Sequence, residues 1–467
     1  MAGDYYATGN VECVLCKFIS LYNNRLQNDA MTDGQDSMYE EFSRTRNVYA
    51  VQLGDGVSIV VHRGIDQIGG CITEISTKSS RVFVDFGQNL PDYMEPTTPE
   101  QDRALVNEIF GQNIKPHQAV IYTHAHDDHV GLFDLIPSDV PQYIGKGGKE
   151  LLITKYGLVL DVHKRRLKDT ESNEDTLSED RRRLRIIKHF RTWKRSKPNI
   201  QPKAFMIGDI SITPFRSCHS IYDSYMFLIQ AAGKRIWHTG DYREHGYLGK
   251  NLYSTLENYA TDVDVLITEG TTLKRDDECI HESEVSERMA CAISSYKYVV
   301  VLASATDIER LATIKEAAKK AHKELYITGA MLSRTTSIFS HREARASGGL
   351  FDFHPQYVRE QDEKIAQMRS VGFVLISGTS QLSFVKTLCG GLPSSEVLLI
   401  YSAWDGYYKD PSQVRRNPAF KDFREAFSNV VDIHTSGHAS RSTIKKVIEI
   451  VNPHHVVCIH RDADAVL

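Results

Sequence analysis

The segment that decides the fold reads Ala119-Val120-Ile121-Tyr122-Thr123-His124-Ala125-His126-Asp127-Asp128-His129-Val130-Gly131. Its first part is apolar and predicts a buried strand over residues 119–123, and the turn after it carries three histidines and two aspartates. Burying so many polar groups without partners would be costly. Imidazoles and carboxylates are the donors that a borderline divalent metal such as zinc binds. A chance polar loop is the weaker interpretation, because H-x-H-x-D-H is far more specific than a lone histidine pair.

The spacing within this turn indicates two neighbouring metal positions. His124 and His126 alternate along an extended chain, so their side chains can face the same way. Asp128 and His129 follow where the chain turns, and they can face a second point close by. The segment therefore predicts a centre with two metal ions.

This motif resembles the signature of the metallo-β-lactamase superfamily, and other segments of the chain occur in that family's order. They are Phe83-Val84-Asp85-Phe86-Gly87, Cys218-His219-Ser220 and His238-Thr239-Gly240-Asp241. The resemblance implies an αββα sandwich of the α/β class with two zinc ions as cofactors. It implies that His124, His126 and His219 hold one zinc ion, that Asp128 and His129 hold the other, and that Asp241 lies between them. It also implies that Asp85 does not bind the metal itself but orients one of the metal ligands.

The position of the last histidine ligand identifies a branch of this superfamily. The next good candidate after Asp241 is His460, in Val457-Cys458-Ile459-His460-Arg461. Roughly 220 residues separate the two, which leaves room for a whole inserted domain. This arrangement resembles the β-CASP branch of nucleic-acid-processing nucleases, which includes ribonuclease J and the endonuclease of eukaryotic pre-mRNA 3′-end processing.

Three further segments are similar to markers of the β-CASP branch. Ile267-Thr268-Glu269-Gly270 is similar to motif A, Thr435-Ser436-Gly437-His438-Ala439-Ser440 to motif B, and the segment from Asn452-Pro453 to His460 to motif C. A histidine in motif C is associated with the RNA-acting members of the branch. The resemblance therefore implies a ribonuclease whose partner is single-stranded RNA.

The same resemblance implies a hydrolytic mechanism in which Asp128, His438 and Glu269 are the catalytic residues. A hydroxide bridging the two zinc ions would attack a phosphodiester. His438, oriented or kept protonated by Glu269, would protonate the leaving oxygen. The small residues of motif B would allow close backbone approach to a substrate phosphate; these are Ser436, Gly437 and Ala439. Standing alone, His438 would be read as a histidine bonded to backbone at a strand end.

Strands and helices alternate along the rest of the chain, which is typical of the α/β class. Predicted strands include residues 72–76, 298–303, 325–327 and 397–401, and a strong helix is predicted over residues 307–321. We expect an N-terminal extension at residues 1–56 and the first part of the metallo-β-lactamase core at 57–272. The β-CASP insert is then expected at 273–428, and the return segment of the core at 429–467.

Charge is distributed unevenly along the chain. The formal net charge of -4 gives no global nucleic-acid signature. Residues 151–198 are nevertheless rich in arginine and lysine, and Leu184, Ile187, Phe190 and Trp193 recur at nearly helical spacing. An amphipathic helix with a basic face over residues 181–197 is therefore predicted. A solvated helix face is the simpler interpretation, and a phosphate-binding surface is the functional one.

The sequence favours a cytoplasmic protein without a membrane partner. A membrane span needs an apolar run of about 18 residues, and no run in the sequence is that long. The start of the sequence lacks the pattern of a secretory signal. The eight cysteines are scattered and form no disulfide framework. Cys13 and Cys16 form one C-x-x-C pair, but a structural zinc site needs a second pair.

Three alternatives stay open at this point. A small-molecule hydrolase of the same superfamily, acting on a lactone or thioester, would use the insert as a lid over its pocket. A non-catalytic nucleic-acid-binding homologue would keep the fold without turnover. Within the nuclease hypothesis, endonuclease and 5′-exonuclease action are both open, since Ser377-Gly378-Thr379-Ser380-Gln381-Leu382 lacks the Gly-Glu of ribonuclease J's phosphate pocket. A homo-oligomer is compatible with each of them.

Overall fold

The computed structural model describes residues 48–90, 97–168, 174–194, 202–275, 279–344 and 348–467. The C-x-x-C pair and most of the predicted N-terminal extension lie outside these residues. Strand β1 (Tyr49–Gln52) falls within the range 1–56 and pairs with the next strand of the first sheet. The division of the chain into domains stays a prediction.

Two six-stranded sheets form one half of the molecule. In the first sheet, β1 to β4 are antiparallel and β4 to β6 are parallel. In the second sheet, β18, β11 and β10 are parallel and β10 to β7 are antiparallel. The remaining strands of the first sheet are, in order, β2 (Ser58–Arg63), β3 (Ile72–Ser76), β4 (Ser80–Val84), β5 (His117–Ile121) and β6 (Gln142–Tyr143). The second sheet has the order β18 (His455–Ile459), β11 (Val265–Glu269), β10 (Lys234–His238), β9 (Ser224–Ala231), β8 (Ile210–Ser217) and β7 (Phe205–Ile207).

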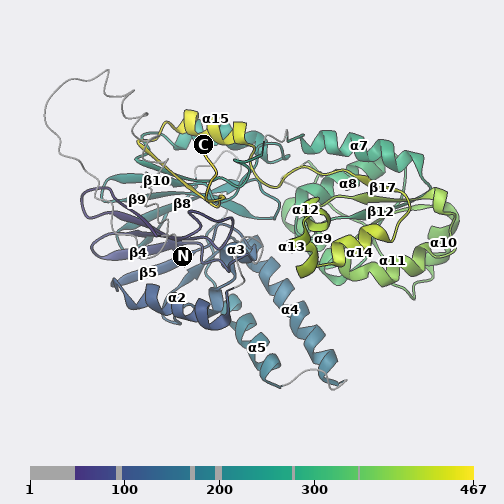
Figure 1. Ribbon diagram of the computed structural model, residues 1–467, viewed down its shortest axis with the longest axis horizontal. Helices are drawn as coiled ribbons and strands as arrows, with labels where there is room; N and C mark the ends of the chain where they lie inside the picture. The colour runs from purple at the N-terminus through teal and green to yellow at the C-terminus, as the bar shows by residue number, and fades with distance from the viewer. Residues whose placement is uncertain (1–47, 91–96, 169–173, 195–201, 276–278, 345–347) are drawn as a thin grey trace, which may run out of the picture.

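The two sheets face each other across a core of branched aliphatic side chains. Ile59 and Ile121 of the first sheet and Ile229 and Ile267 of the second are all fully buried there. The helices cover the outer faces, with α2 (Pro99–Gly111) on the first sheet and α6 (Leu252–Tyr259) and α15 (Arg441–Val451) on the second. Figure 1 shows the four layers from α15 down to α2. The predicted αββα sandwich is confirmed.

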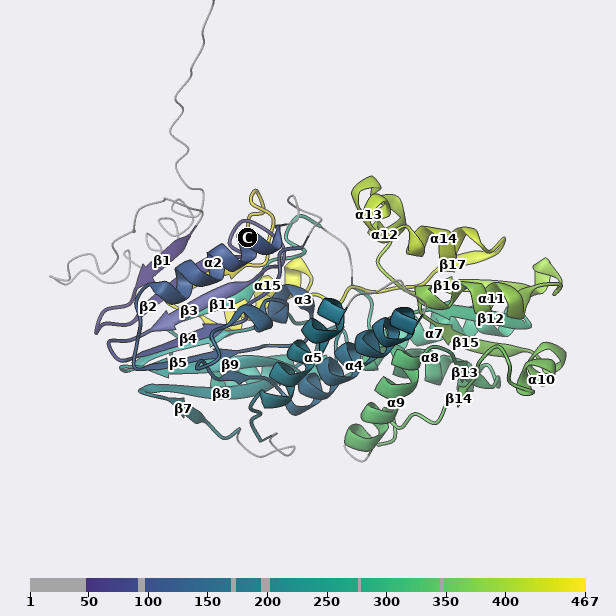
Figure 2. The same cartoon turned by 90° about the horizontal axis from the view of Figure 1, so that it is seen from below.

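The other half of the molecule is an α/β unit inserted between β11 and β18 of the second sheet (Figure 2). Its sheet is wholly parallel and lies between helices, which explains why strands such as β12 are apolar at every position. The strand order is β14 (Gln356–Tyr357), β13 (Leu325–Ile327), β15 (Phe373–Ser377), β12 (Tyr298–Leu302), β16 (Val397–Tyr401) and β17 (Val430–Asp432). Its helices are α7 (Glu282–Ser295), α8 (Ile308–Lys320), α9 (Ala330–Glu343), α10 (Lys364–Val371), α11 (Leu382–Cys389), α12 (Gly406–Lys409), α13 (Pro411–Arg416) and α14 (Ala419–Glu425).

Local signals set several element boundaries where the sequence predicted them. The side chain of Thr98 accepts from the Gln101 backbone N–H ahead of α2, and Asp307 accepts from two backbone N–H groups at the start of α8. Strands β3, β13 and β16 have the bounds predicted for residues 72–76, 325–327 and 397–401. No helix in the described parts of the chain is both long enough and apolar enough to cross a membrane.

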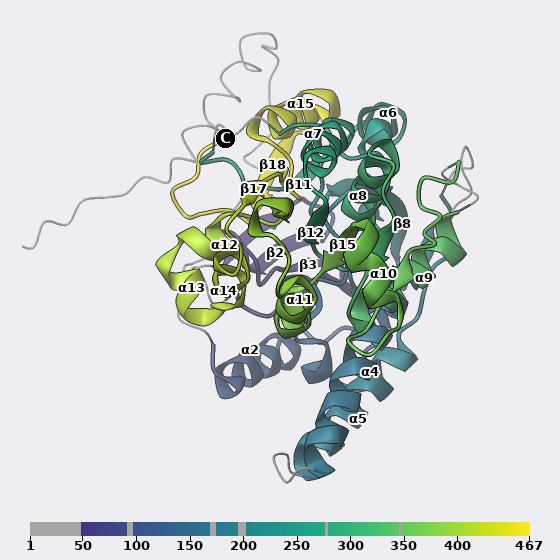
Figure 3. The same cartoon turned by 90° about the vertical axis from the view of Figure 1, so that its right-hand side faces the viewer.

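The basic segment forms a helical hairpin rather than one helix. Helix α4 (Lys146–Lys168) precedes α5 (Glu174–His189), and the pair projects from the body of the molecule in Figure 3. The predicted helix through Phe190 and Trp193 is wrong at its end. Both side chains are buried beyond α5, where the Phe190 ring stacks on Tyr122 at 5.6 Å between centroids. Aromatic packing against the sheets therefore ends the helix before its apolar periodicity does.

Candidate metal centre

The predicted metal ligands come from loops at one edge of both sheets. His124 and His126 follow β5, and Asp128 and His129 lie in the short helix α3 (Asp127–Val130). From the second sheet, His219 follows β8, Asp241 follows β10 and His460 follows β18. The carboxyl ends of β4 and β5, and those of β10, β11 and β18, lie at this edge because β4 pairs in parallel with β5 and β11 pairs in parallel with both β10 and β18. Residues far apart in sequence are thereby brought together.

The backbone of this edge is unusually constrained. Asp85 and His460 both adopt positive φ values, 62° and 53°, which non-glycine residues rarely occupy. Gly87 approaches the metal loop so closely that an added Cβ would lie 1.7 Å from the carbonyl oxygen of Asp128. Strained backbone of this kind persists where the surrounding structure holds it, commonly at functional sites.

One group of ligand atoms gathers around His126. Its Nδ1 lies 3.0 Å from His124 Nε2 and 3.2 Å from His219 Nε2. Asp241 Oδ2 closes the group, at 3.8 Å from His124 Nε2 and 3.7 Å from His219 Nε2. These are the residues that the family resemblance implied for the first zinc ion, with Asp241 beside them.

A second group of ligand atoms shares the same oxygen of Asp241. His129 Nε2 lies 3.1 Å and His460 Nε2 3.6 Å from Asp241 Oδ2. Asp128 Oδ2 lies 3.6 Å from His129 Nε2 and 3.1 Å from His460 Nε2. Asp241 therefore stands between the two groups, as the resemblance implied.

Both groups suit tetrahedral metal ions. Zinc bonds of about 2.0–2.2 Å place two tetrahedral ligand atoms about 3.4 Å apart, and the measured separations run from 3.0 to 3.8 Å. His129 Nε2 is buried and contacts Asp241 Oδ2 at 3.1 Å, yet it makes no hydrogen bond of good geometry among the described residues, an arrangement that a metal ion would satisfy. The donor set is therefore chemically suited to two metal ions.

The other ring nitrogens of these histidines are held by protein groups. His129 Nδ1 lies 2.8 Å from Asp85 Oδ2, and His219 Nδ1 donates to the Gly437 carbonyl at 2.6 Å. Thr123 Oγ1, which donates to Asp85, lies 2.9 Å from His124 Nδ1. Such bonds fix the tautomer and leave Nε2 as the metal-binding atom. Asp85 thus lies where a ligand-orienting residue is needed.

Electrostatics keep most of these groups in the form that a metal binds. Burial holds the pKa of His124 and His219 well below the ordinary value and lowers that of His126 to about 4. His129 differs, because Asp241, Asp128 and Asp85 outweigh burial and raise its pKa. Burial opposes ionisation of Asp241, but the neighbouring histidines hold its pKa well below the ordinary value. Neutral imidazoles and charged carboxylates are the forms that coordinate zinc.

His438 lies at the edge of this cluster with its ring partly exposed. Its Nδ1 lies 2.7 Å from Glu269 Oε2 and 3.8 Å from Asp241 Oδ2, and its side chain is 24% exposed. Burial lowers the pKa of His438, but Glu269 and then Asp241 raise it to about 9. A histidine bound in this way can carry a proton at Nε2 at neutral pH.

The small residues of motif B are also beside the cluster. Ser436 Oγ accepts from the His438 backbone N–H at 3.1 Å, and the carbonyls of Gly437 and Ala439 accept from His219 and Thr272. A Cβ on Gly437 would lie 2.4 Å from Ser220 Oγ, so only glycine fits. Their carbonyl oxygens therefore hold the loop in place.

Two residues of the cluster were not predicted from the sequence. Thr271 Oγ1 donates to Glu269 Oε2 at 2.7 Å and lies 2.8 Å from His460 Nδ1, so it links motif A to the last ligand. The buried thiol of Cys71 lies within 4.8 Å of donor atoms of His129 and His460. Thr271 follows Glu269 by two residues, which is the signal that could have identified it. Nothing in the local sequence marks Cys71.

Comparison with known proteins agrees with this fold. Residues 90–297 match a family model described as a beta-lactamase superfamily domain. Ribonuclease J of Helicobacter pylori (strain ATCC 700392 / 26695) is 22% identical over 430 residues, which cover 88% of this chain and 57% of that protein. Ribonuclease J of Sinorhizobium meliloti (strain Sm2011 / Rm2011 / 2011) is 22% identical over 407 residues, covering 82% and 64%. The chain thus spans less than two thirds of the length of these curated relatives.

A solved structure has the same fold across nearly its whole length. It is a protein of unknown function from Enterococcus faecalis V583, superposed with a TM-score of 0.61 at 18% identity. The match covers 88% of this chain and 95% of that one, so it includes the inserted unit. The chain therefore resembles the beta-lactamase superfamily domain over residues 90–297 and ribonuclease J proteins along most of its length.

Proposed function

We propose that this protein is a zinc-dependent phosphodiesterase that cleaves single-stranded RNA. The observation that carries the proposal is the pair of four-atom groups that share Asp241 Oδ2, with the Glu269–His438 pair beside them. Similarity to two ribonuclease J proteins supports RNA as the substrate. We place the protein in the cytoplasm by the same inference.

Two zinc ions fit the donor atoms of the centre. His124, His126 and His219 would hold one ion, Asp128, His129 and His460 the other, and Asp241 both. When bound, the ions would lower the pKa of a coordinated water molecule and polarise the oxygens of the phosphodiester.

The protein's own groups supply proton transfer and orientation. Glu269 Oε2 contacts Nδ1 of His438, whose side chain is partly exposed, so the Nε2 of the ring could give a proton to the leaving oxygen. Ser436, Gly437 and Ala439 place the backbone of the loop next to His438 and the ligand His219. Asp85 holds the ring of His129 in the orientation that binds metal.

A panel of substrates separates this proposal from its alternatives. Purified protein is expected to cleave labelled single-stranded RNA, to lose that activity in a chelator and to regain it with zinc. Single-stranded DNA and a chromogenic lactone are assayed in parallel. Turnover of the lactone alone would replace the nuclease with a small-molecule hydrolase, and RNA binding without cleavage would indicate a non-catalytic homologue.

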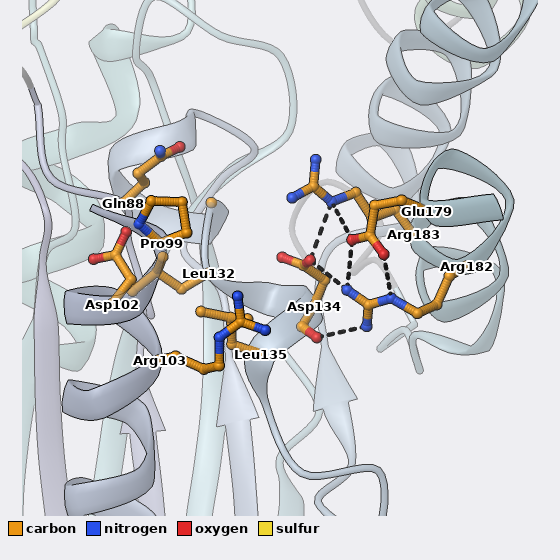
Figure 4. A pocket seen from close by; sticks show the side chains of 11 residues that line it. Gln88, Pro99, Asp102, Arg103, Leu132, Asp134, Leu135, Glu179, Arg182 and Arg183 are labelled. Carbon is orange, nitrogen blue, oxygen red and sulfur yellow. Dashed lines mark hydrogen bonds and ion pairs between the residues drawn. The ribbon is translucent and has the colours of Figure 1, made fainter. Parts of the chain in front are cut away.

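The helical hairpin has fewer positive charges free to bind RNA than its sequence indicates. Figure 4 shows Arg182 and Arg183 bonded to Asp134 beside a pocket of about 620 Å³. The distances to Asp134 Oδ2 are 2.7 Å from Arg182 Nη2 and 3.0 Å from Arg183 Nε, and Glu179 contacts both arginines. These two arginines are thus largely neutralised. The exposed arginine and lysine residues of α5 are Arg181, Arg185 and Lys188.

Reversing the charges of Arg181, Arg185 and Lys188 with glutamate is expected to weaken RNA binding and its salt dependence. Losing three phosphate contacts on a single strand would reduce the slope of log K against log salt by about 2. Binding is measured by fluorescence anisotropy across a salt series. The matched control reverses Arg288, Lys319 and Lys320, which are exposed on α7 and α8. If the two triple variants bind RNA equally at every salt concentration, the basic face of α5 is only a solvated helix face.

A further inference from the structure

The loop that returns the chain from the insert is held through three successive carbonyl oxygens. It runs from the end of β17 to the start of α15 and carries Ser436, Gly437 and His438. Each oxygen accepts from a buried ring or guanidinium nitrogen. The contacts are Arg310 Nη2 to Thr435 O (3.2 Å), Arg243 Nη1 and His245 Nε2 to Ser436 O (3.0 and 2.7 Å), and His219 Nδ1 to Gly437 O (2.6 Å).

Arg310 extends from the insert to this loop. It belongs to α8, is 2% exposed, and binds both carboxylate oxygens of Glu282 through Nε at 3.2 and 3.1 Å. Its Nη1 donates to Ser402 Oγ at 2.7 Å and lies 2.9 Å from His434 Nδ1. The planar guanidinium therefore joins α7, the end of β16 and the return loop.

Glu282 joins Arg310 to a second buried arginine from the sandwich. Arg243 follows β10 and lies 3.1 Å from Glu282 Oε1 through Nη1. Burial opposes ionisation of Glu282, but the two guanidinium groups hold its pKa well below the ordinary value. Its own backbone N–H donates to the His245 carbonyl at 2.9 Å. The result is a continuous chain of buried ionic contacts from the insert to the sandwich.

Such a network is not explained by stability alone. Buried ion pairs often contribute little net stability, because the free energy needed to remove the charges from water is about as large as the free energy of their attraction. Arginine at such a place fixes geometry, since its planar fork donates in set directions. Here those directions fix the carbonyls immediately before His438, whose ring must meet both Glu269 and the metal cluster.

We propose that Arg310 is a positioning residue, which acts with Glu282 and Arg243 to fix the return loop and so the ring of His438. The insert is then an integral part of the catalytic centre rather than a lid over it. This inference rests on the proposed function, because it assigns a role in the same reaction.

The substitution Arg310→Lys tests the inference while keeping the charge that pairs with Glu282. Lysine cannot donate to Glu282, Ser402 and the Thr435 carbonyl at once. We expect kcat on RNA to fall about 10- to 100-fold, as a misplaced catalytic group does, while KM changes less than about threefold and zinc content is unchanged. The matched control is Arg216→Lys, because Arg216 of β8 pairs with the buried Glu343 of α9 across the same two units without contacting the return loop. This control is expected to keep the wild-type kcat.

A double-mutant comparison distinguishes positioning of His438 from a general loss of structure. In a His438→Ala background, Arg310→Lys is expected to cause no further loss of kcat. An undiminished further loss, an unchanged kcat in the single variant, or an equal loss in Arg216→Lys would overturn the inference. Should Arg310→Lys fail to fold, Ser402→Ala, which removes one acceptor of Arg310, is measured in its place, and an unchanged kcat there would also overturn it.

The outcome separates this inference from the function on which it rests. If the wild-type protein cleaves RNA and Arg310→Lys cleaves it equally well, only the positioning role of Arg310 is rejected. If the wild-type protein does not cleave RNA, both the proposed function and the positioning role are rejected.

Discussion

Replacing Asp128 and His129 together by alanine is expected to abolish RNA cleavage, with a loss of about a thousandfold or more. The substitution removes two of the four ligand atoms in the second group and leaves only His460 and the shared Asp241. Metal ions supply several kcal/mol of transition-state stabilisation, and each 1.36 kcal/mol corresponds to about a tenfold change in rate. The measurement is the single-turnover rate on labelled RNA, together with the zinc content of the folded variant.

The metal count makes the result specific to the second group. We expect the double variant to bind one equivalent of zinc where the wild type binds two, because the group around His126 keeps its histidines. A control at Asp127, whose side chain pairs with the exposed Lys155 and faces away from the cluster, should keep both ions and full activity. Undiminished cleavage by the Asp128→Ala/His129→Ala variant would refute the metal mechanism.

The second large effect is expected from His438→Ala. Loss of a general acid lowers a rate by about 10²–10⁴-fold, and the ring of His438 is a partly exposed imidazole at the edge of the cluster. The loss should depend on the leaving group. A phosphodiester with a p-nitrophenolate leaving group hardly needs protonation, so the variant should cleave it at close to the wild-type rate.

The leaving-group comparison contains its own control. A variant that had lost metal or structure would be equally slow on both substrates, so a selective loss on RNA identifies proton donation. Glu269→Gln should show the same selectivity with a smaller loss, because the carboxylate acts through Nδ1 of His438. Equal losses on the two substrates in His438→Ala would reject the general-acid role.

The architecture is predictable from the sequence, and most of the predicted cluster residues that the fold brings together lie in a recognisable local context. His124, His126, Asp128 and His129 share one short motif, and the others follow the ends of apolar strands. His460 is different. Its link to a motif more than 300 residues earlier was inferred from family resemblance, and no local physical rule could have given it.

What the sequence does not predict depends on tertiary packing. The end of α5 at His189 is decided by burial of Phe190, which competes with helical periodicity. Arg310 and Glu282 look like ordinary charged helix residues in the sequence, and only the fold makes them buried partners. Likewise, the ring nitrogen that faces a metal is fixed by a second residue such as Asp85.

The place of β18 in the second sheet has a consequence for the time course of synthesis. This strand pairs in parallel with β11, yet about 190 residues of chain lie between Glu269 and His460. At about 5–20 residues per second, translation of that interval takes about 10–40 s. During this time the nascent chain carries every other ligand but lacks His460. The complete cluster of candidate metal ligands can therefore form only after the insert has been made.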